Sequence, residues 1–118
     1  MNIEELRDFC MAQKAVSESF PFDETTLVFK VLGKMFCLTD TEDEFSINIK
    51  NDPEKIIQFR EEYPAVLPGY HMNKKYWNTV MVDGSISDKI LKEWVMESYW
   101  SVVHSMPKKK QQELNDIK

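Results

Sequence analysis

The residues with the widest range of chemistry are concentrated in one run, from Pro68 to Asp83. The run opens with a Pro-Gly pair, continues through side chains that hydrogen-bond, stack or carry positive charge, and ends at an Asp-Gly turn. Its candidate ligand-binding residues are His71, Asn73, Lys74, Lys75 and Asn78. Adjacent lysines on a rigid hairpin can meet phosphate groups without loss of core packing. Exposed lysines also commonly serve only to solvate a surface, so both interpretations stay open.

Three residues of this run have a structural interpretation beside the functional one. Trp77 opens an alternating stretch, so it is expected to bury its ring against the C-terminal helix, although an exposed ring would offer a stacking platform. Asn73 lies in a turn, where such side chains commonly bond to their own backbone. Asn78 alternates with Trp77 and is predicted to point to the polar face of the sheet.

The motifs of common enzyme classes are absent from the sequence. It contains no G-x-S-x-G, Walker loop, dinucleotide fingerprint, H-E-x-x-H or Cys/His metal spacing. The acidic run Asp40–Glu44 fails as a calcium loop because Phe45 occupies the glycine position, so it is predicted to be a hairpin tip. His71 is the only candidate acid or base, since His104 falls on the last turn of a helix. We therefore expect no enzyme activity, no cofactor and no bound metal.

Composition and charge narrow the class of protein further. The 118 residues suffice for one unaided domain, and their net charge of −5 disfavours a protein that simply coats nucleic acid. The charge is uneven: residues 1–65 hold 14 acidic and 7 basic side chains, against 6 and 8 in residues 66–118. Cys10 and Cys37 lack CxxC spacing, and no apolar run approaches membrane-spanning length. We expect a cytoplasmic protein with two reduced core thiols and no membrane contact.

The elements that must position the central run follow from apolar periodicity. Alternation predicts strands over residues 27–31, 35–38, 45–50 and 77–82. Leu32 and Gly33 should form a turn with only Gly33 at positive φ. Ser46, Asn48 and Lys50, beside Lys30, should give the sheet a polar face, which would be either a contact surface or merely solvated. The stretch 15–24 is predicted to be a loop held by buried Phe20 and Phe22, and a short extra strand could include His71 and Met72.

Helices should cover the other face. Asn2, Asp52 and Ser87 are predicted N-caps, the last for a long helix with an apolar stripe that ends at Pro107. The predicted fold class is α+β, a two-layer sandwich in which an antiparallel sheet carries the first and last helices on one face. A single domain is expected over residues 1–107, followed by a polar, lysine-rich tail over residues 108–118.

Several of these segments resemble the MmcQ/YjbR family. The resemblance rests on V-x-G-K-x-F ending at Phe36, on Pro53, on PGYHMNKKYWNTV at residues 68–80 and on the Ser98, Tyr99 pair. It implies a fold similar to the bacterial frataxin homologue CyaY and DNA binding through a double-wing motif. One position departs from the family, because Asp23 stands where a Pro-Phe-Gly segment would have glycine.

The resemblance implies a small, non-enzymatic DNA-binding protein whose hairpin wings contact phosphates. The wings would be the turn containing Lys34 and the segment from Asn73 to Tyr76, with His71 and Asn78 nearby. The alternative is a module for protein interaction or small-anion binding on the polar face of the sheet, as frataxin-like proteins use theirs for partners.

Overall fold

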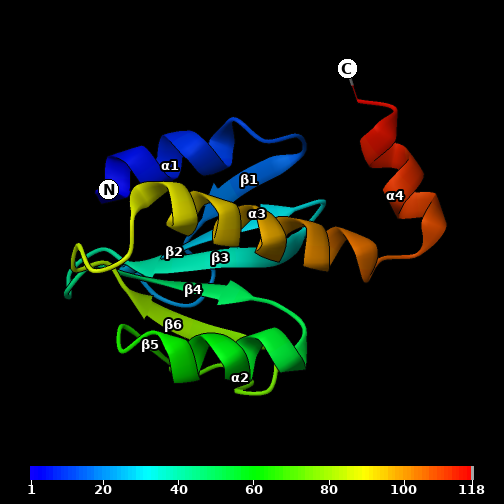
Figure 1. Ribbon diagram of the computed structural model, residues 1–118. Coiled ribbons are helices and arrows are strands. Elements are labelled where there is room, and N and C mark those ends of the chain that lie inside the picture. The colour runs from blue at the N-terminus through cyan, green and yellow to red at the C-terminus, as the bar shows by residue number, and fades with distance from the viewer. Residues whose placement is uncertain (118) are drawn as a thin grey trace.

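A computed structural model describes residues 1–117 as a six-stranded antiparallel sheet with four helices (Figure 1). The strand order across the sheet is β1-β2-β3-β4-β6-β5. The strands are β1 Val16–Ser19, β2 Thr26–Val31, β3 Lys34–Asp40, β4 Ser46–Lys50, β5 Val66–Pro68 and β6 Trp77–Met81. The helices are α1 Ile3–Met11, α2 Pro53–Glu62, α3 Asp88–His104 and α4 Lys108–Asn115.

The N-caps of the first three helices are those predicted from the sequence. The side chains of Asn2, Asp52 and Ser87 accept hydrogen bonds from the third backbone N–H of α1, α2 and α3, respectively. Pro53 occupies the first turn of α2, where its missing N–H costs no helical hydrogen bond. These capping residues therefore fix the residue at which each of the three helices begins.

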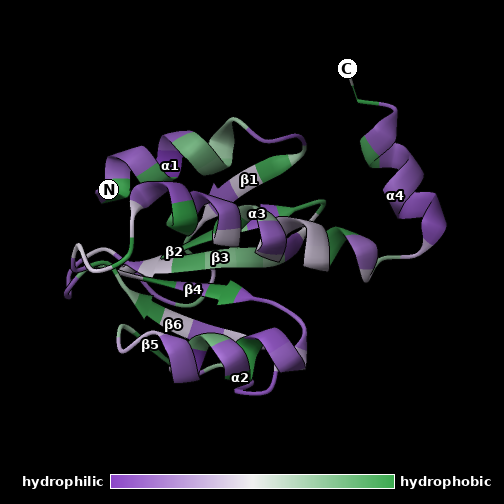
Figure 2. Ribbon diagram, viewed as in Figure 1, coloured by the Kyte–Doolittle hydropathy of each residue, from purple (hydrophilic) through white to green (hydrophobic). Residues whose placement is uncertain are grey.

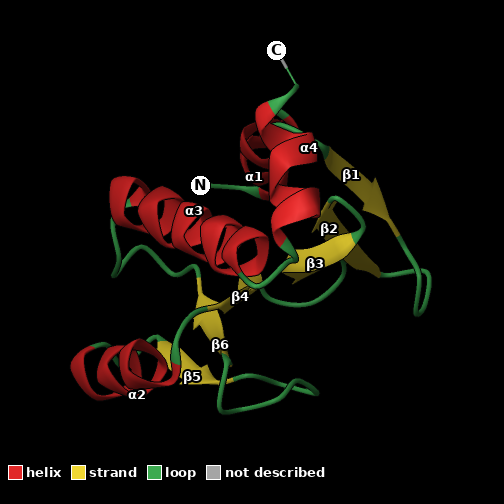
Figure 3. Cartoon of the chain, turned by 90° about the vertical axis from the view of Figure 1, so that its right-hand side faces the viewer, coloured by secondary structure: helices red, strands yellow, loops and turns green. Residues whose placement is uncertain are grey.

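The predicted two-layer α+β class is confirmed. Helices α3 and α2 lie on the same side of the sheet (Figure 3), and the rings of Phe59 on α2 and Trp94 on α3 stack at 4.5 Å between centroids. The main core lies between the helices on this side and the sheet, and it includes Phe29, Phe36 and both free cysteines. We call the opposite side, which carries no helix within residues 1–117, the open face.

Ser98 on α3 joins two strands at the point where they separate. The β3–β4 pairing covers only Cys37 with Ile49 and Leu38 with Asn48. Beyond it, the Ser98 hydroxyl donates to the carbonyl of Phe36 at 2.5 Å and accepts from the N–H of Lys50 at 2.7 Å. A helix side chain thereby satisfies two backbone groups that the strand ladder leaves open.

Two local predictions near the N-terminal half are wrong. Residues 16–19 form the edge strand β1 instead of a loop, and Phe20 and Phe22 are exposed instead of buried. Short, half-polar edge strands carry little apolar alternation, which is why the sequence pattern missed this one.

The β2–β3 turn also differs from the prediction that only Gly33 has a positive φ. Both Leu32 (φ 49°) and Gly33 (φ 84°) lie in the left-handed region, the type I′ geometry that matches strand twist.

Side chains of β3 and β6 divide between the two faces of the sheet, and the faces of Trp77 and Asn78 differ from expectation. A β-bulge between Phe29 and Lys30 shifts the register, so Phe36 enters the main core while Leu38 faces the open side. Trp77 is buried, but with Val28 and Leu38 on the open face and not against α3. Asn78 accordingly points to the helix side, where it is only 2% exposed.

The segment predicted as a polar tail contains α4. Figure 2 shows this helix as mostly hydrophilic, yet Leu114 is buried in the main core cluster. Lys118 lies outside the described residues.

Candidate binding groove on the open face

The open face is hollowed into a groove of about 1260 Å³. Its floor comes from alternate residues of the central strands, whose side chains share one face because strand residues alternate sides. Its rim comes from the loops that follow β1, β3 and β5. The lining residues are Phe22, Asp23, Thr26, Met35, Leu38, Asp40, Asp43, Glu44, Ser46, Asn48, Leu67, Pro68, Tyr70, His71, Met72, Asn73, Trp77, Thr79 and Met81.

The loop 69–76 forms one wall of the groove, and Gly69 holds it close to the sheet. The N–H of Gly69 donates to the carbonyl of Trp77 at 3.1 Å. A Cβ at position 69 would lie 2.9 Å from both the Cβ and the carbonyl oxygen of Trp77, closer than such atoms approach. The Pro-Gly pair of the central run therefore permits a close backbone approach.

Arg60 on α2 secures the far end of the same loop. Its Nε donates to Oδ1 of Asn78 at 2.7 Å, and its guanidinium also donates to the carbonyls of Lys74 and Trp77. Asn78 in turn donates from Nδ2 to the carbonyl of Ile56 at 3.0 Å. Asn78 is thus a positioning residue for the wall and is unavailable to a ligand, which corrects its predicted role.

Thr79 organises the floor. Its hydroxyl donates to Oδ1 of Asn48 at 2.5 Å and accepts from the N–H of Tyr70 at 2.9 Å. These bonds tie β4, β6 and the wall loop together. Beside them, Leu38 and Trp77 provide an apolar area of floor, against which Met72 of the wall loop packs.

The rim exposes large apolar side chains. Tyr70 is 72% exposed and Phe22 is 64% exposed, and Leu67 on β5 is also exposed. His71 adopts φ 57° and its ring lies 4.1 Å from that of Tyr70 between centroids. A positive φ at a non-glycine residue is a strained conformation of the kind that clusters at binding sites.

The groove is acidic. Four carboxylates line it, those of Asp23, Asp40, Asp43 and Glu44, and no lysine or arginine is among its lining residues within residues 1–117. Hydrogen bonds from the backbone of Thr26 and Thr25 hold the pKa of Asp23 below its usual range, so this group is ionised at neutral pH. The charged side chains of this lining therefore favour cations over phosphates.

The predicted nucleic-acid-binding residues are distributed over several environments. Lys34, Lys74 and Lys75 are exposed, although Nζ of Lys74 donates to the carbonyl of Gly69 at 3.2 Å. His71 and Asn73 line the acidic groove, and Oδ1 of Asn73 accepts from the N–H of Lys75, the local bond expected of a turn.

One cationic cluster does form beside the groove. Nζ of Lys50 lies 5.8 Å and Nζ of Lys75 5.5 Å from the ring centroid of Tyr76, on the wall loop. The predicted polar face is thus divided, because Ser46 and Asn48 line the groove whereas Lys50 lies against Tyr76.

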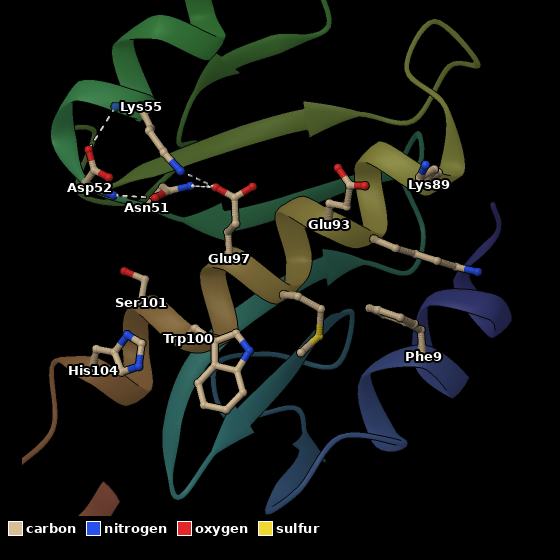
Figure 4. A pocket seen from close by; sticks show the side chains of 12 residues that line it. Phe9, Asn51, Asp52, Lys55, Lys89, Glu93, Glu97, Trp100, Ser101 and His104 are labelled. Atoms are coloured by element: carbon tan, nitrogen blue, oxygen red, sulfur yellow. Dashed lines mark hydrogen bonds and ion pairs between the residues drawn. The ribbon is translucent and has the colours of Figure 1, made fainter. Parts of the chain in front are cut away.

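A second hollow lies on the helix side, between α1, α3 and the start of α2 (Figure 4). We call it the helix-side pocket; it measures about 870 Å³ and contains the exposed ring of Trp100. Its central polar groups already bond to one another. Nζ of Lys55 lies 2.9 Å from Oε1 of Glu97, and this hydrogen bond raises the lysine pKa. Nδ2 of Asn51 donates to the same carboxylate oxygen at 3.1 Å.

Sequence reasoning missed the acidic and aromatic rim of the groove. Phe22 and Asp23 come from the loop after β1 and Tyr70 from the loop after β5, and only the fold brings these two loops to one face. The exposed Phe-Asp pair after a Pro could have indicated a rim. Among residues 1–117, no group of three or more His, Cys, Asp or Glu side chains is placed to hold a metal ion. No helix in that range is long and apolar enough to cross a membrane.

The fold and the groove define a small α+β domain with one covered and one open sheet face. A family model described as YjbR matches residues 11–101, and the chain belongs to this family. Escherichia coli O157:H7 YbdF is 38% identical over 93 residues, which are 78% of this chain and 76% of YbdF. Escherichia coli K12 YjbR is 32% identical over 111 residues, 93% of this chain and 94% of YjbR. Both proteins carry the description "uncharacterized".

Solved structures confirm the architecture. The crystal structure of a Deinococcus radiodurans protein with a DUF419 domain matches with a TM-score of 0.90 and 38% identity, covering 97% of this chain and 88% of that one. A Pseudomonas syringae protein matches with a TM-score of 0.74 over 86% of this chain and 99% of that one; at 22% identity it shows the shared fold alone.

Proposed function

We propose that the chain is a non-enzymatic binding protein that holds a segment of a partner protein in the open-face groove. The observation that carries this proposal is the make-up of the groove: exposed aromatic rim, apolar and hydrogen-bonding floor, and carboxylates without lysine or arginine among its described lining residues. Aromatic residues are enriched at protein interfaces, whereas phosphate binding depends on positive charge.

The size of the groove supports a partner larger than a metabolite. Its volume of about 1260 Å³ exceeds the range of roughly 300 to 1,000 Å³ typical of small-molecule sites. Exposed Phe22, Leu67 and Tyr70 surround it, and large apolar side chains gathered on one surface are typical of an interaction site.

The polar groups of the groove support binding over catalysis. The Thr79 hydroxyl is engaged with Asn48 and the Tyr70 N–H, so it has no adjacent base to activate it as a nucleophile. Three of the four carboxylates, those of Asp23, Asp43 and Glu44, are exposed at the rim, and none of the four hydrogen-bonds to the Thr79 hydroxyl.

The test is selection of random 12-residue peptides displayed on phage, first on the wild-type protein. Selected clones are then assayed on Ser46→Trp, which fills the groove, and on Ser101→Trp, which fills the helix-side pocket as a matched control. We expect clones that lose binding to the first variant and keep it with the second. Clones that behave the opposite way, or the absence of any selected clone, would contradict the proposal.

DNA binding is the second candidate function, favoured by Lys50 and Lys75 around Tyr76 and by exposed Lys34 and Lys74. A protein using these lysines should lose duplex affinity linearly in log salt, and Lys74→Ala with Lys75→Ala should reduce the slope by about two. Fluorescence anisotropy at low salt measures both. Equal affinity of the double variant and the wild type would remove these lysines from any DNA contact.

A further inference from the structure

We infer that the partner segment in the groove is an extended stretch of chain carrying lysine or arginine. This inference rests on the proposed function and adds the chemistry and length of the ligand. Its basis is the charge of the groove lining, which within residues 1–117 holds four carboxylates and no lysine or arginine, together with the exposed aromatic rim. This lining is matched to a cationic chain and mismatched to an acidic one.

Two of the four carboxylates have roles in their own loops. Asp23 accepts hydrogen bonds from the backbone of Thr25 and Thr26, and Oδ1 of Asp40 accepts from the N–H of Glu42. These bonds fix the position of each charge at the rim while leaving carboxylate lone pairs for a ligand.

Asp43 and Glu44 have no such role. Both are exposed, and neither carboxylate makes a hydrogen bond or ion pair with any residue in the described range 1–117. Two adjacent like charges at one hairpin tip repel each other. A cationic partner relieves this repulsion, whereas an acidic partner increases it.

The aromatic rim supplies a complementary contact. Tyr70 presents an exposed ring on the wall loop, and Phe22 presents another on the loop that carries Asp23. Guanidinium and ammonium groups bind over aromatic faces, with Trp and Tyr among the better partners. A chain with basic side chains can thus place its charge near the carboxylates and its aliphatic stems on the apolar floor.

The width of the sheet sets the length of the segment. The groove extends from residues on β2 to residues on β5, which are separated by β3, β4 and β6. At about 4.8 Å per strand spacing this distance is roughly 19 Å, the length of about six extended residues. A segment of that length crosses the strands and contacts both the acidic and the aromatic rim.

The experiment uses the peptides selected in the display test. We expect the clones that depend on the groove to carry a net positive charge within about six consecutive residues. For the strongest such peptide, Asp43→Asn with Glu44→Gln should raise the Kd roughly tenfold at low salt. The matched control is Glu4→Gln with Glu5→Gln on α1, which changes net charge equally and should alter the Kd less than twofold.

The outcomes separate the two proposals. Groove-dependent clones that are neutral or acidic would overturn the basic segment and leave the groove as the binding site. Equal effects of the two double variants would also overturn it. Clones insensitive to Ser46→Trp, or no clones, would overturn the groove itself and this inference with it. Spermidine binding at least as tightly as the peptide would assign the groove to a small organic cation, which contradicts a protein segment.

Discussion

The two faces of the sheet differ in how their polar groups are used. On the helix side the sheet is buried, and the polar groups that point there are bonded within the fold: Ser98 joins β3 and β4, and Asn78 joins α2 to the wall loop. On the open face, Asp43, Glu44 and the Tyr70 ring remain exposed around a groove. We propose on this contrast that the covered face supplies stability and the open face recognition.

The largest loss of stability should follow from removing a large side chain on the covered face. Trp94 is 5% exposed and packs against Phe59 and Tyr63. Trp94→Ala should lower the free energy of unfolding by about 3 to 5 kcal/mol, because the cavity cannot fill with water. Trp77→Ala on the open face should cost less, about 3 kcal/mol, since Trp77 packs in a small cluster with Val28 and Leu38. Urea unfolding of both variants measures the difference, and equal losses would contradict the contrast between the faces.

Ser98→Ala should give the next largest loss in the free energy of unfolding. The substitution leaves the Phe36 carbonyl and the Lys50 N–H without their buried partner, a cost of roughly 1 to 3 kcal/mol for each such group. Ser101→Ala, one turn farther along α3 and half-buried, should stay within about 0.5 kcal/mol of wild type. Chemical denaturation tests the pair, and similar midpoints would show that Ser98 does not bridge the strands.

Gly69→Ala tests the wall of the groove. The added Cβ meets backbone and Cβ atoms of Trp77, which cannot move aside as a flexible side chain would, so a loss of about 1 to 3 kcal/mol is expected. Gly84→Ala is the control: its Cβ meets open space, and only its positive φ opposes the change, at about 1 kcal/mol. If thermal unfolding showed Gly69→Ala to be less destabilising than Gly84→Ala, the close backbone approach at position 69 would be disproved.

Tyr99→Phe should give the smallest effect. The Tyr99 hydroxyl donates to the carbonyl of Lys14 at 2.8 Å, a bond worth about 1 kcal/mol. Burial raises the pKa of Tyr99 above its usual value, so its contribution to stability is full below the unfolded pKa near 10 and is lost as pH rises further.

The wild type should therefore lose stability above about pH 10 more steeply than Tyr99→Phe. Parallel pH dependences of the unfolding midpoint would remove Tyr99 as the cause.

The sequence predicted the covered face well and the open face poorly. Caps at Asn2, Asp52 and Ser87 and the stripe of α3 depend on local spacing, which a sequence displays directly. Trp77 and Asn78 were assigned to the wrong faces because alternation gives two sets of residues without saying which set the helices cover.

Most of the groove could not be predicted from the sequence, for a related reason. Its rim is assembled from loops after β1, β3 and β5, whose meeting depends on the strand order and on two short edge strands with weak patterns. The floor residues Ser46 and Asn48 could be predicted, because they alternate cleanly with Ile47 and Ile49. The candidate residues His71 and Asn73 also line the groove.

The most direct test of the central claim is an NMR titration of the full chain with the strongest groove-selected peptide, following backbone amide shifts. The account predicts saturable shifts at Ser46, Asn48 and Thr79 on the floor of the groove, with Glu97 and Trp100 in the helix-side pocket unchanged. Shifts confined to Glu97, Trp100 and their neighbours would place recognition on the covered face and contradict the account.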